Sequence, residues 1–308
     1  MKITNVIILF TTFLLCLIVL TGTASTRCSK VGVYILDDMF GLNGVENSCK
    51  SEYPNRIYDD VPPQPKTKFT NFNKNLSYKV KRECPKNKSV ILIIGQSNAA
   101  NSGLALIKED KKNLNFNPAD NFCYQLSEPV LGADGTHGDS ITSSIGKKIK
   151  IKDEVIFLNI SVAGSSINEW GKWYGSDVNK SLKFILNENY LKASVWMQGE
   201  AEDFKSSKNY FKNFMTLKDI MFKDLHNQFN NSLYIITRST ICANRENQEI
   251  INLEMEKQRQ KIRKNFKNIE LLKITDTLDK SYRHDGCHFN RKGIDKISSI
   301  IANKINHN

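Results

Sequence analysis

Two distant places in this sequence hold residues that could act together to hydrolyse an ester. Ser97 follows an apolar run in "VILIIGQSN", and Asp285 and His288 lie in the late stretch "RHDGCHFN". Ester hydrolysis needs a nucleophile, a base that takes its proton and a carboxylate that orients the base. The spacing of Asp285 and His288 lets a turn point the carboxylate at the imidazole Nδ1. Ser97 is therefore the candidate nucleophile, provided that the fold brings it to His288.

Two further stretches offer hydrogen-bond donors for the anionic intermediate of such a reaction. The backbone N–H groups of Ser97 and of Gly164, in "SVAGSS", are suitable, and the side-chain amide of Gln198, in "WMQGEAED", is a third candidate. The candidate substrate contacts in these stretches are Gln96, Asn98, Trp170 and Glu200. Three of the assignments have alternatives. Asn98 fixes either the turn or the substrate, and Trp170 is either a sugar-stacking ring or part of the core. For Glu200, as for Asp203, we favour a structural role.

An alternation of apolar runs and helical patterns positions these stretches. Buried strands are predicted at residues 90–94, 155–160, 194–197 and 233–237, with a weaker one at 269–274. Helical patterns lie at residues 182–189, 203–229, 247–264 and 291–305. Such alternation predicts an α/β fold with a parallel sheet, helices on both faces and a site at the carboxyl ends of the strands. We therefore expect the four stretches to meet at one edge.

Two other histidines lie near these stretches but are weaker candidates for the base. His284 adjoins Asp285, yet only His288 has the aspartate at the required offset. A histidine beside a turn is more often exposed to solvent. His137 lies in the glycine-rich stretch "GADGTHGDS", and we do not expect it to contact the site.

The start of the chain indicates export. An apolar run at residues 6–20, preceded by Lys2 and followed by small residues, is typical of a signal peptide. Residues 1–24 are thus a signal peptide or, if they are retained, a membrane tether, which predicts a secreted, periplasmic or cell-surface protein. Residues 25–88 form an irregular, proline-containing N-terminal extension, and residues 89–308 form the catalytic domain.

Cysteine usage agrees with export. Six cysteines lie outside the leader: Cys28, Cys49, Cys84, Cys123, Cys242 and Cys287. An even number in an oxidising compartment favours disulfides over free buried thiols, and no short paired spacing indicates a zinc site. A bond between Cys242 and Cys287 would brace the loop that carries His288, which is a better explanation of Cys287 than a thiol nucleophile.

The overall charge argues against one class of partner. Lys plus Arg number 44 against 32 Asp plus Glu, so the net charge is +12 over 308 residues. The basic residues are spread along the chain, without a compact block or an aromatic–basic motif. We therefore expect a solvated basic surface and no nucleic-acid binding. The charge gives a slight preference for an acidic ligand.

Four stretches together resemble a known family. "GQSN", "VAGSSINEW", "WMQGEAED" and "DGCHFN" are similar, in order and spacing, to the blocks of SGNH (GDSL-like) hydrolases, and most of all to the sialate O-acetylesterases and related carbohydrate acetylesterases. The wider superfamily has asparagine in the third block, whereas Gln-Gly-Glu is usual in this branch. The resemblance implies a flavodoxin-like three-layer α/β/α sandwich, a triad of Ser97, Asp285 and His288, and no metal or other cofactor.

The implied activity is the removal of O-acetyl groups from a glycan through an acyl-enzyme. The substrate is then an O-acetylated sialic acid or another acetylated polysaccharide. Two alternatives use the same fold. One is a glycan O-acetyltransferase with the same triad, and the other is an inactive glycan-binding module, which the presence of all three triad residues disfavours.

Overall fold

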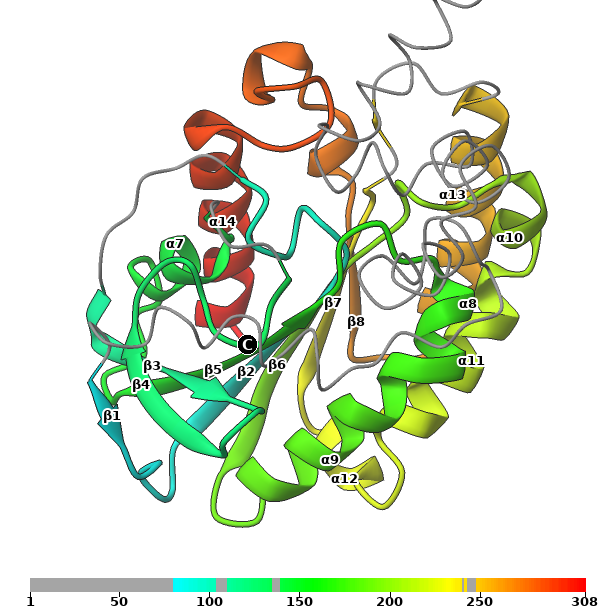
Figure 1. The fold of residues 1–308 in the computed structure, drawn as a ribbon. Helices are drawn as coiled ribbons and strands as arrows, with labels where there is room; N and C mark the ends of the chain where they lie inside the picture. The colour runs from blue at the N-terminus through cyan, green and yellow to red at the C-terminus, as the bar shows by residue number, and fades with distance from the viewer. Residues whose placement is uncertain (1–79, 104–109, 135–138, 240, 243–247) are drawn as a thin grey trace, which may run out of the picture. The chain divides into compact units, whose positions relative to one another are not determined.

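The computed structural model describes residues 80–103, 110–134, 139–239, 241–242 and 248–308. At its centre is an eight-stranded sheet in the spatial order β1-β4-β3-β5-β2-β6-β7-β8 (Figure 1). From β1 to β8 the strands are Lys81–Arg82, Ser89–Gly95, Asp110–Asn117, Phe122–Leu126, Val155–Ser161, Tyr190–Met197, Leu233–Thr237 and Ile269–Leu272. Among these strands β4 alone runs against its neighbours. The sheet is parallel as predicted except at this edge.

The helices cover both faces of the sheet and complete the three-layer sandwich that the sequence predicts. α7 and α14 lie on one face, and α9, α11 and α13 lie on the other (Figure 1). The helical segments are α7 Thr142–Gly146, α8 Ile167–Glu169, the π-helical turn Trp170–Tyr174, α9 Gly175–Ile185, α10 Phe204–Lys208, α11 Tyr210–Met221, α12 His226–Asn230, α13 Gln248–Asn265 and α14 Arg291–Asn306. Short 3₁₀ turns lie at Ile274–Asp276 and Lys280–Tyr282.

The central strand β2 shows why an unbroken apolar run becomes a buried strand here. All seven of its residues are buried. Val90, Leu92 and Ile94 pack under α9, α11 and α13, whereas Ile91 and Ile93 pack under α7 and α14. Because side chains alternate between the faces of a sheet, a strand covered on both sides tends to be apolar at successive positions. The run therefore ends where the chain leaves the sheet, just before the stretch that carries Ser97.

Gly95 makes that exit possible. Its φ is +145°, a conformation that L side chains rarely adopt. A Cβ added there would lie 2.0 Å from the carbonyl oxygen of Met197 in the neighbouring strand β6. Only glycine permits this close approach, which keeps the turn after β2 tight against the end of β6.

One predicted helix is divided. The helical pattern predicted at residues 203–229 forms α10, α11 and α12. Asn209 separates α10 from α11 with φ −97° and ψ 3°, and Asp224 has a φ of +64° between α11 and α12. Neither conformation continues an α-helix, so one amphipathic pattern covers three short segments.

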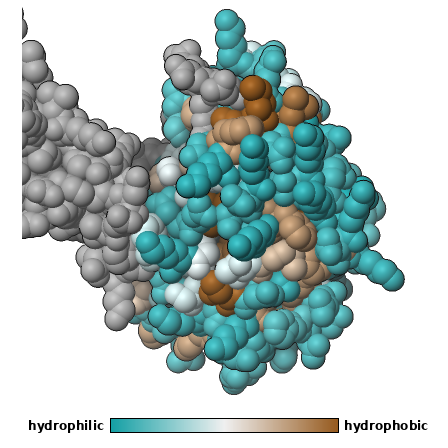
Figure 2. Space-filling view, turned by 90° about the vertical axis from the view of Figure 1, so that its right-hand side faces the viewer, coloured by the Kyte–Doolittle hydropathy of each residue, from teal (hydrophilic) through white to brown (hydrophobic). Residues whose placement is uncertain are grey.

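The surface over α10 and α13 is mainly hydrophilic, with scattered apolar side chains (Figure 2). Phe204, Ile250 and Leu253 are the exposed large apolar residues on these two helices. Scattered exposed residues of this kind are normal on protein surfaces. Within the described ranges, no helix combines the length and the apolar character needed to cross a membrane. The predicted leader, most of the extension, Cys28, Cys49 and His137 lie outside the described residues.

Candidate active site

The four stretches that the sequence singles out meet at the carboxyl edge of the sheet. Strands β5, β2 and β6 are neighbours, so the loops that follow them are adjacent. The side chain of Gln198, after β6, donates to the carbonyl of Ser165, after β5, at 3.2 Å. Gln96, after β2, accepts from the backbone N–H of Ala201 at 3.0 Å. These contacts join three of the loops, and Asn98 adds the fourth.

Asp285 and His288 form a tight pair in the last loop. Oδ2 of Asp285 lies 2.6 Å from Nδ1 of His288, and Oδ1 accepts from the backbone N–H groups of Cys287 and His288 at 2.9 and 2.7 Å. Burial works against the charged carboxylate, but the hydrogen bonds from His288 and Cys287 outweigh it and hold the pKa of Asp285 well below its usual range. The carboxylate is therefore ionised and fixes the imidazole so that Nε2 is the free nitrogen.

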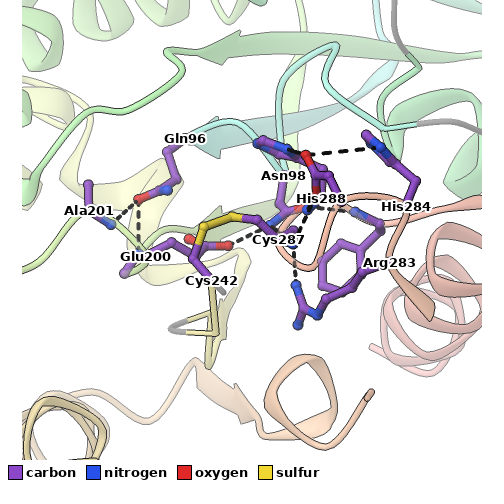
Figure 3. Close-up of a disulfide and its surroundings, with 12 residues drawn as sticks. Gln96, Asn98, Glu200, Ala201, Cys242, Arg283, His284, Cys287 and His288 are labelled. Carbon is purple, nitrogen blue, oxygen red and sulfur yellow. Dashed lines mark hydrogen bonds and ion pairs between the residues drawn. A yellow bond between two sulfur atoms is a disulfide. The ribbon is translucent and has the colours of Figure 1, made fainter. Parts of the chain in front are cut away.

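The side chain of Asn98 connects this loop to the turn that follows β2. Its Nδ2 donates to Oε1 of Glu200 at 2.6 Å and to the carbonyl of Cys287 at 3.3 Å, and its Oδ1 accepts from the backbone N–H of Phe289 at 3.1 Å. Figure 3 shows Asn98 lying between Glu200 and the loop. The residue after Ser97 is thus bonded to both chain neighbours of His288, so the two segments lie side by side.

Ser97 lies in the turn after β2, and 6% of its surface is exposed. Among the described residues, its hydroxyl makes no hydrogen bond in this structure, to His288 or to any other group. Catalytic hydrogen bonds are often formed only when substrate is bound. Ser97 therefore directly precedes the residue that bonds the His288 loop, and no described group holds its hydroxyl.

Two backbone N–H groups near Ser97 are available as donors. Within the described residues, neither the N–H of Ser97 nor that of Gly164 is used in a hydrogen bond. Gly164 is exposed, has a φ of +70°, and a Cβ added there would meet no atom within 4 Å. An open loop with a free N–H at the sheet edge is a suitable donor to an oxyanion.

The side-chain amide of Gln198, the predicted third donor to the oxyanion, is bonded to other protein groups. Its side chain is fully buried, and its amide nitrogen donates to the carbonyl of Ser165 and to the carboxylate of Glu202. Glu202 also accepts from the backbone N–H of Ile167 at 2.7 Å. Gln198 therefore ties the loop after β6 to the segment after β5. Oε1 of Gln96 likewise accepts hydrogen bonds from the backbone N–H groups of Gly199 and Ala201 in the loop after β6.

Trp170 and Asp203 stabilise the fold: the first packs in the core and the second caps a helix. Trp170 is fully buried, its ring contacts Trp196 edge-on with centroids 5.2 Å apart, and its Nε1 donates to Ser165 at 2.8 Å. This is the core environment, the second of the two alternatives left by the sequence. Asp203 caps α10 by accepting from the N–H of Ser206 at 2.6 Å, in agreement with the structural role that we favour.

Arg283 is a buried support of the loop that the sequence does not single out. Its guanidinium donates to the carbonyls of Cys287 and Thr275 and lies over the ring of Phe289, 4.3 Å from the centroid. Burial lowers the pKa of Arg283 against the raising effect of nearby Glu200 and Asp276. The position of Arg283, two residues before Asp285, was the only signal in the sequence, and an exposed arginine would give the same pattern.

Two disulfides lie among the described residues. They join Cys84 to Cys123 and Cys242 to Cys287, which confirms the predicted Cys242–Cys287 pair. Cys242 follows β7, so this bond fixes the Asp285–His288 loop to the strand edge (Figure 3). The first bond instead joins the segment after β1 to β4.

The Cys242–Cys287 bond is expected to support activity as well as stability. Replacing both cysteines by serine should lower the free energy of unfolding by about 2–5 kcal/mol. Because Cys287 stands between Asp285 and His288, kcat for ester cleavage should also fall roughly 10–100-fold through misplacement of the pair. The matched control is the double serine variant at Cys84 and Cys123. The disulfide that it removes joins residues at a similar sequence separation, 39 against 45. Equal kcat values for the two double variants would contradict the expectation.

Glu200 makes the stability of the fold depend on pH. Burial raises the pKa of its carboxyl from 4.5 to about 7, although hydrogen bonds from Asn98 and Ser239 oppose the rise. The contribution of this group to stability is therefore fully present below pH 4.5 and is lost as the pH rises through 7. Glu200→Gln keeps an acceptor for Asn98 but removes the titration. The variant should gain about 3 kcal/mol relative to the parent on going from below pH 4.5 to above pH 7.

Urea unfolding of the parent and of Glu200→Gln at the two pH values measures this difference. Glu249→Gln, at an exposed position of α13, is the control. A stability difference between parent and Glu200→Gln that stays constant with pH would show that the buried carboxyl does not titrate as described.

A comparison with known proteins identifies the family of this chain. Residues 87–307 match the family described as carbohydrate esterase, sialic acid-specific acetylesterase. The chain belongs to this family. Membership confirms the resemblance to SGNH hydrolases drawn from the four stretches and supports an acetylesterase activity, which is a carboxylic ester hydrolase activity. A sequence search of curated proteins finds no match.

Among the solved structures similar to this carbohydrate esterase, one with a TM-score above 0.5 shares its fold. A protein from Arabidopsis thaliana has a TM-score of 0.58 at 16% identity, covering 73% of this chain and 99% of its own. An acetylxylan esterase from Geobacillus stearothermophilus has a TM-score of 0.45 at 11% identity, with coverages of 73% and 96%. A carbohydrate acetylesterase from Xanthomonas citri has a TM-score of 0.47 at 13% identity, with coverages of 71% and 56%.

Proposed function

We propose that this chain is an exported serine esterase that removes O-acetyl groups from a carbohydrate, with Ser97 as nucleophile, His288 as base and Asp285 as its orienting carboxylate. One observation carries the proposal. The side chain of Asn98, next to Ser97, is hydrogen-bonded to both chain neighbours of His288. Residues almost two hundred positions apart are thereby held together, and the pairing of Nδ1 with Asp285 leaves Nε2 of the imidazole free to accept a proton.

The reaction follows from these positions. The Ser97 oxygen attacks the acetyl carbonyl carbon while Nε2 of His288 takes the serine proton. The negative charge on the carbonyl oxygen is stabilised by the N–H groups of Ser97 and Gly164. The sugar oxygen then leaves with the proton from His288, and an acetyl-serine remains. Water, activated by the same imidazole, releases acetate and restores the serine.

In this mechanism the buried polar residues position the loops. Gln198 and Glu202 hold the segments after β5 and β6 together, so they keep the N–H of Gly164 in place. Asn98 and Glu200 hold the Asp285–His288 loop against the turn of Ser97. Fixed donors of this kind lower the barrier because they need no reorganisation during the reaction.

The substrate class and the cellular location are also proposals. The family description favours an O-acetylated sialic acid, and a net charge of +12 favours an acidic glycan in the encounter. The two disulfides are compatible with an oxidising compartment, which supports export.

Acetate release tests the function. The purified chain should release acetate from p-nitrophenyl acetate and, with higher kcat/KM, from an O-acetylated sialic acid; acetylated xylan is the neutral-polysaccharide comparison. Preference for xylan would replace the sialic acid assignment but keep the esterase. Transfer of the acetyl group to an added sugar acceptor, detected as a new sugar ester in place of free acetate, would identify a transferase. No turnover of any ester would contradict the proposed function.

A further inference from the structure

A second histidine beside the proposed catalytic pair has no role in the proposed reaction. The ring of His284 stacks against that of His288, with centroids 5.8 Å apart and planes at 24°. Nδ1 of His284 lies 4.0 Å from Oδ2 of Asp285. His284, Asp285 and His288 each offer one ligand atom, and these atoms lie within 4.8 Å of one another. Three donors of this kind on one short loop can bind a cation once each ligand atom presents a lone pair to it.

The hydrogen bonding of His284 frees one lone pair. Its Nε2 lies 3.2 Å from the backbone carbonyl of Ser102, which can only accept a hydrogen bond. Nε2 therefore carries the proton, and in the neutral ring the lone pair of Nδ1 faces the Asp285 carboxylate. A histidine whose other nitrogen donates to a backbone carbonyl is the usual arrangement of a metal ligand, because that bond fixes the tautomer and the ring orientation.

We propose that His284, Asp285 and His288 bind a borderline-soft divalent cation such as Zn²⁺, and that this ion inhibits the esterase. Two imidazoles and a carboxylate suit zinc better than magnesium, which prefers oxygen ligands. Ligand atoms around a tetrahedral zinc lie about 3.3 Å apart. The separations of Asp285 Oδ2 from the two histidines, 4.0 and 2.6 Å, lie on either side of this value. Moderate side-chain rotations therefore complete the site, with water as fourth ligand.

The ion can reach this site and would stop the reaction. The exposed fractions of the three side chains are 32% for His284, 43% for Asp285 and 26% for His288. Coordination by Asp285 takes the carboxylate away from His288, and coordination by Nδ1 of His288 releases its proton to solvent. The imidazole then no longer shuttles a proton for Ser97. The proposal of ion binding rests on the geometry of the three side chains alone, whereas the proposal of inhibition also rests on the proposed function.

Direct binding and activity measured on the full chain test the two parts separately. Calorimetric titration with Zn²⁺ should give one site, and Co²⁺ should give the visible absorption of a tetrahedral complex. Zn²⁺ should inhibit esterase activity at the concentrations at which it binds, and Mg²⁺ should not. His284→Gln should weaken Zn²⁺ binding and inhibition together, roughly 10–100-fold, and leave the metal-free activity unchanged. His226→Gln, at an exposed position of α12 distant in sequence from the His284–His288 loop, is the control and should behave as the parent.

Equal affinity of the parent and of His284→Gln for Zn²⁺ would overturn the site. Inhibition that persists in His284→Gln with unchanged dependence on Zn²⁺ would overturn the role of His284 in inhibition. A chain that binds Zn²⁺ through His284 but cleaves no ester before metal is added would refute the proposed function and leave the cation site standing.

Discussion

Ser97→Ala should lower kcat for acetate release by roughly three to six orders of magnitude. The alanine has no oxygen to attack the acetyl carbon, so the acyl-enzyme route is closed and only the oxyanion donors and substrate binding remain. The loss should appear in kcat and not in KM, because the hydroxyl acts on the reacting atoms. Initial rates with p-nitrophenyl acetate and with an O-acetylated sialic acid measure it.

The substitution at Ser97 should leave the fold intact. The hydroxyl makes no hydrogen bond among the described residues, so the Asn98 contacts do not depend on it. Ser102→Ala is the matched control, since it removes a serine hydroxyl from the same turn while the backbone carbonyl that contacts His284 remains. Rapid quenching followed by mass spectrometry should find one acetyl group on the peptide that contains Ser97. Equal acetate release by the parent and by Ser97→Ala would exclude the serine mechanism.

Strands buried on both faces could be predicted from the sequence. The predicted ends of β2, β5 and β7 lie within one residue of the observed ends, because most positions in these strands are apolar and leave a nearly continuous run. The helix at 291–305 was found for a related reason. Asn290 caps α14 by accepting from the N–H groups of Lys292 and Gly293, and an apolar stripe follows at helical spacing.

Strand β3 could not be predicted, because polar side chains on one of its faces are buried as well. Asn113, Asn115 and Asn117 alternate with Leu114 and Phe116, and all five are buried. In sequence such asparagines indicate a loop. In the structure their amides serve neighbouring segments: Asn115, for example, accepts from the N–H of Leu131 at 2.6 Å and donates to its carbonyl at 3.2 Å. The amides of this strand are satisfied by hydrogen bonds to loops distant in the sequence, so the strand has no local sequence signature.

The candidate site divides in the same way. The sequence could indicate Ser97, Asp285 and His288, because reactive residue types follow strand ends and one pair has a local spacing. It could not indicate that Asn98 bonds Glu200 and the loop of His288, because partners 102 and more residues apart are paired only by the sheet order. From the sequence, Asn98 could therefore be assigned only to the turn or to the substrate, and Glu200 to a structural role without a named partner.

Asp285→Asn should lower kcat by about four orders of magnitude while the loop keeps its shape. The amide oxygen of asparagine can still accept from the backbone N–H groups of Cys287 and His288, which Oδ1 of Asp285 now does. Its NH₂ group, however, would face Nδ1 of His288 and donate to it. The imidazole would then carry its proton on Nε2, the nitrogen that must take the proton of Ser97. The variant thus holds the base in place in the wrong tautomer.

Two measurements separate this electronic effect from loss of the loop. Asp285→Asn should retain a free energy of unfolding closer to that of the parent than Asp285→Ala, which removes both backbone bonds as well. The parent should also show a downfield proton resonance from the short Nδ1–H···Oδ2 bond of 2.6 Å, and Asp285→Asn should lack it. Asp295→Asn, at an exposed position of α14 paired with Lys148, is the control. If Asp285→Asn keeps more than a tenth of the parental kcat, Asp285 does not orient the base, and the carboxylate serves only to shape the loop.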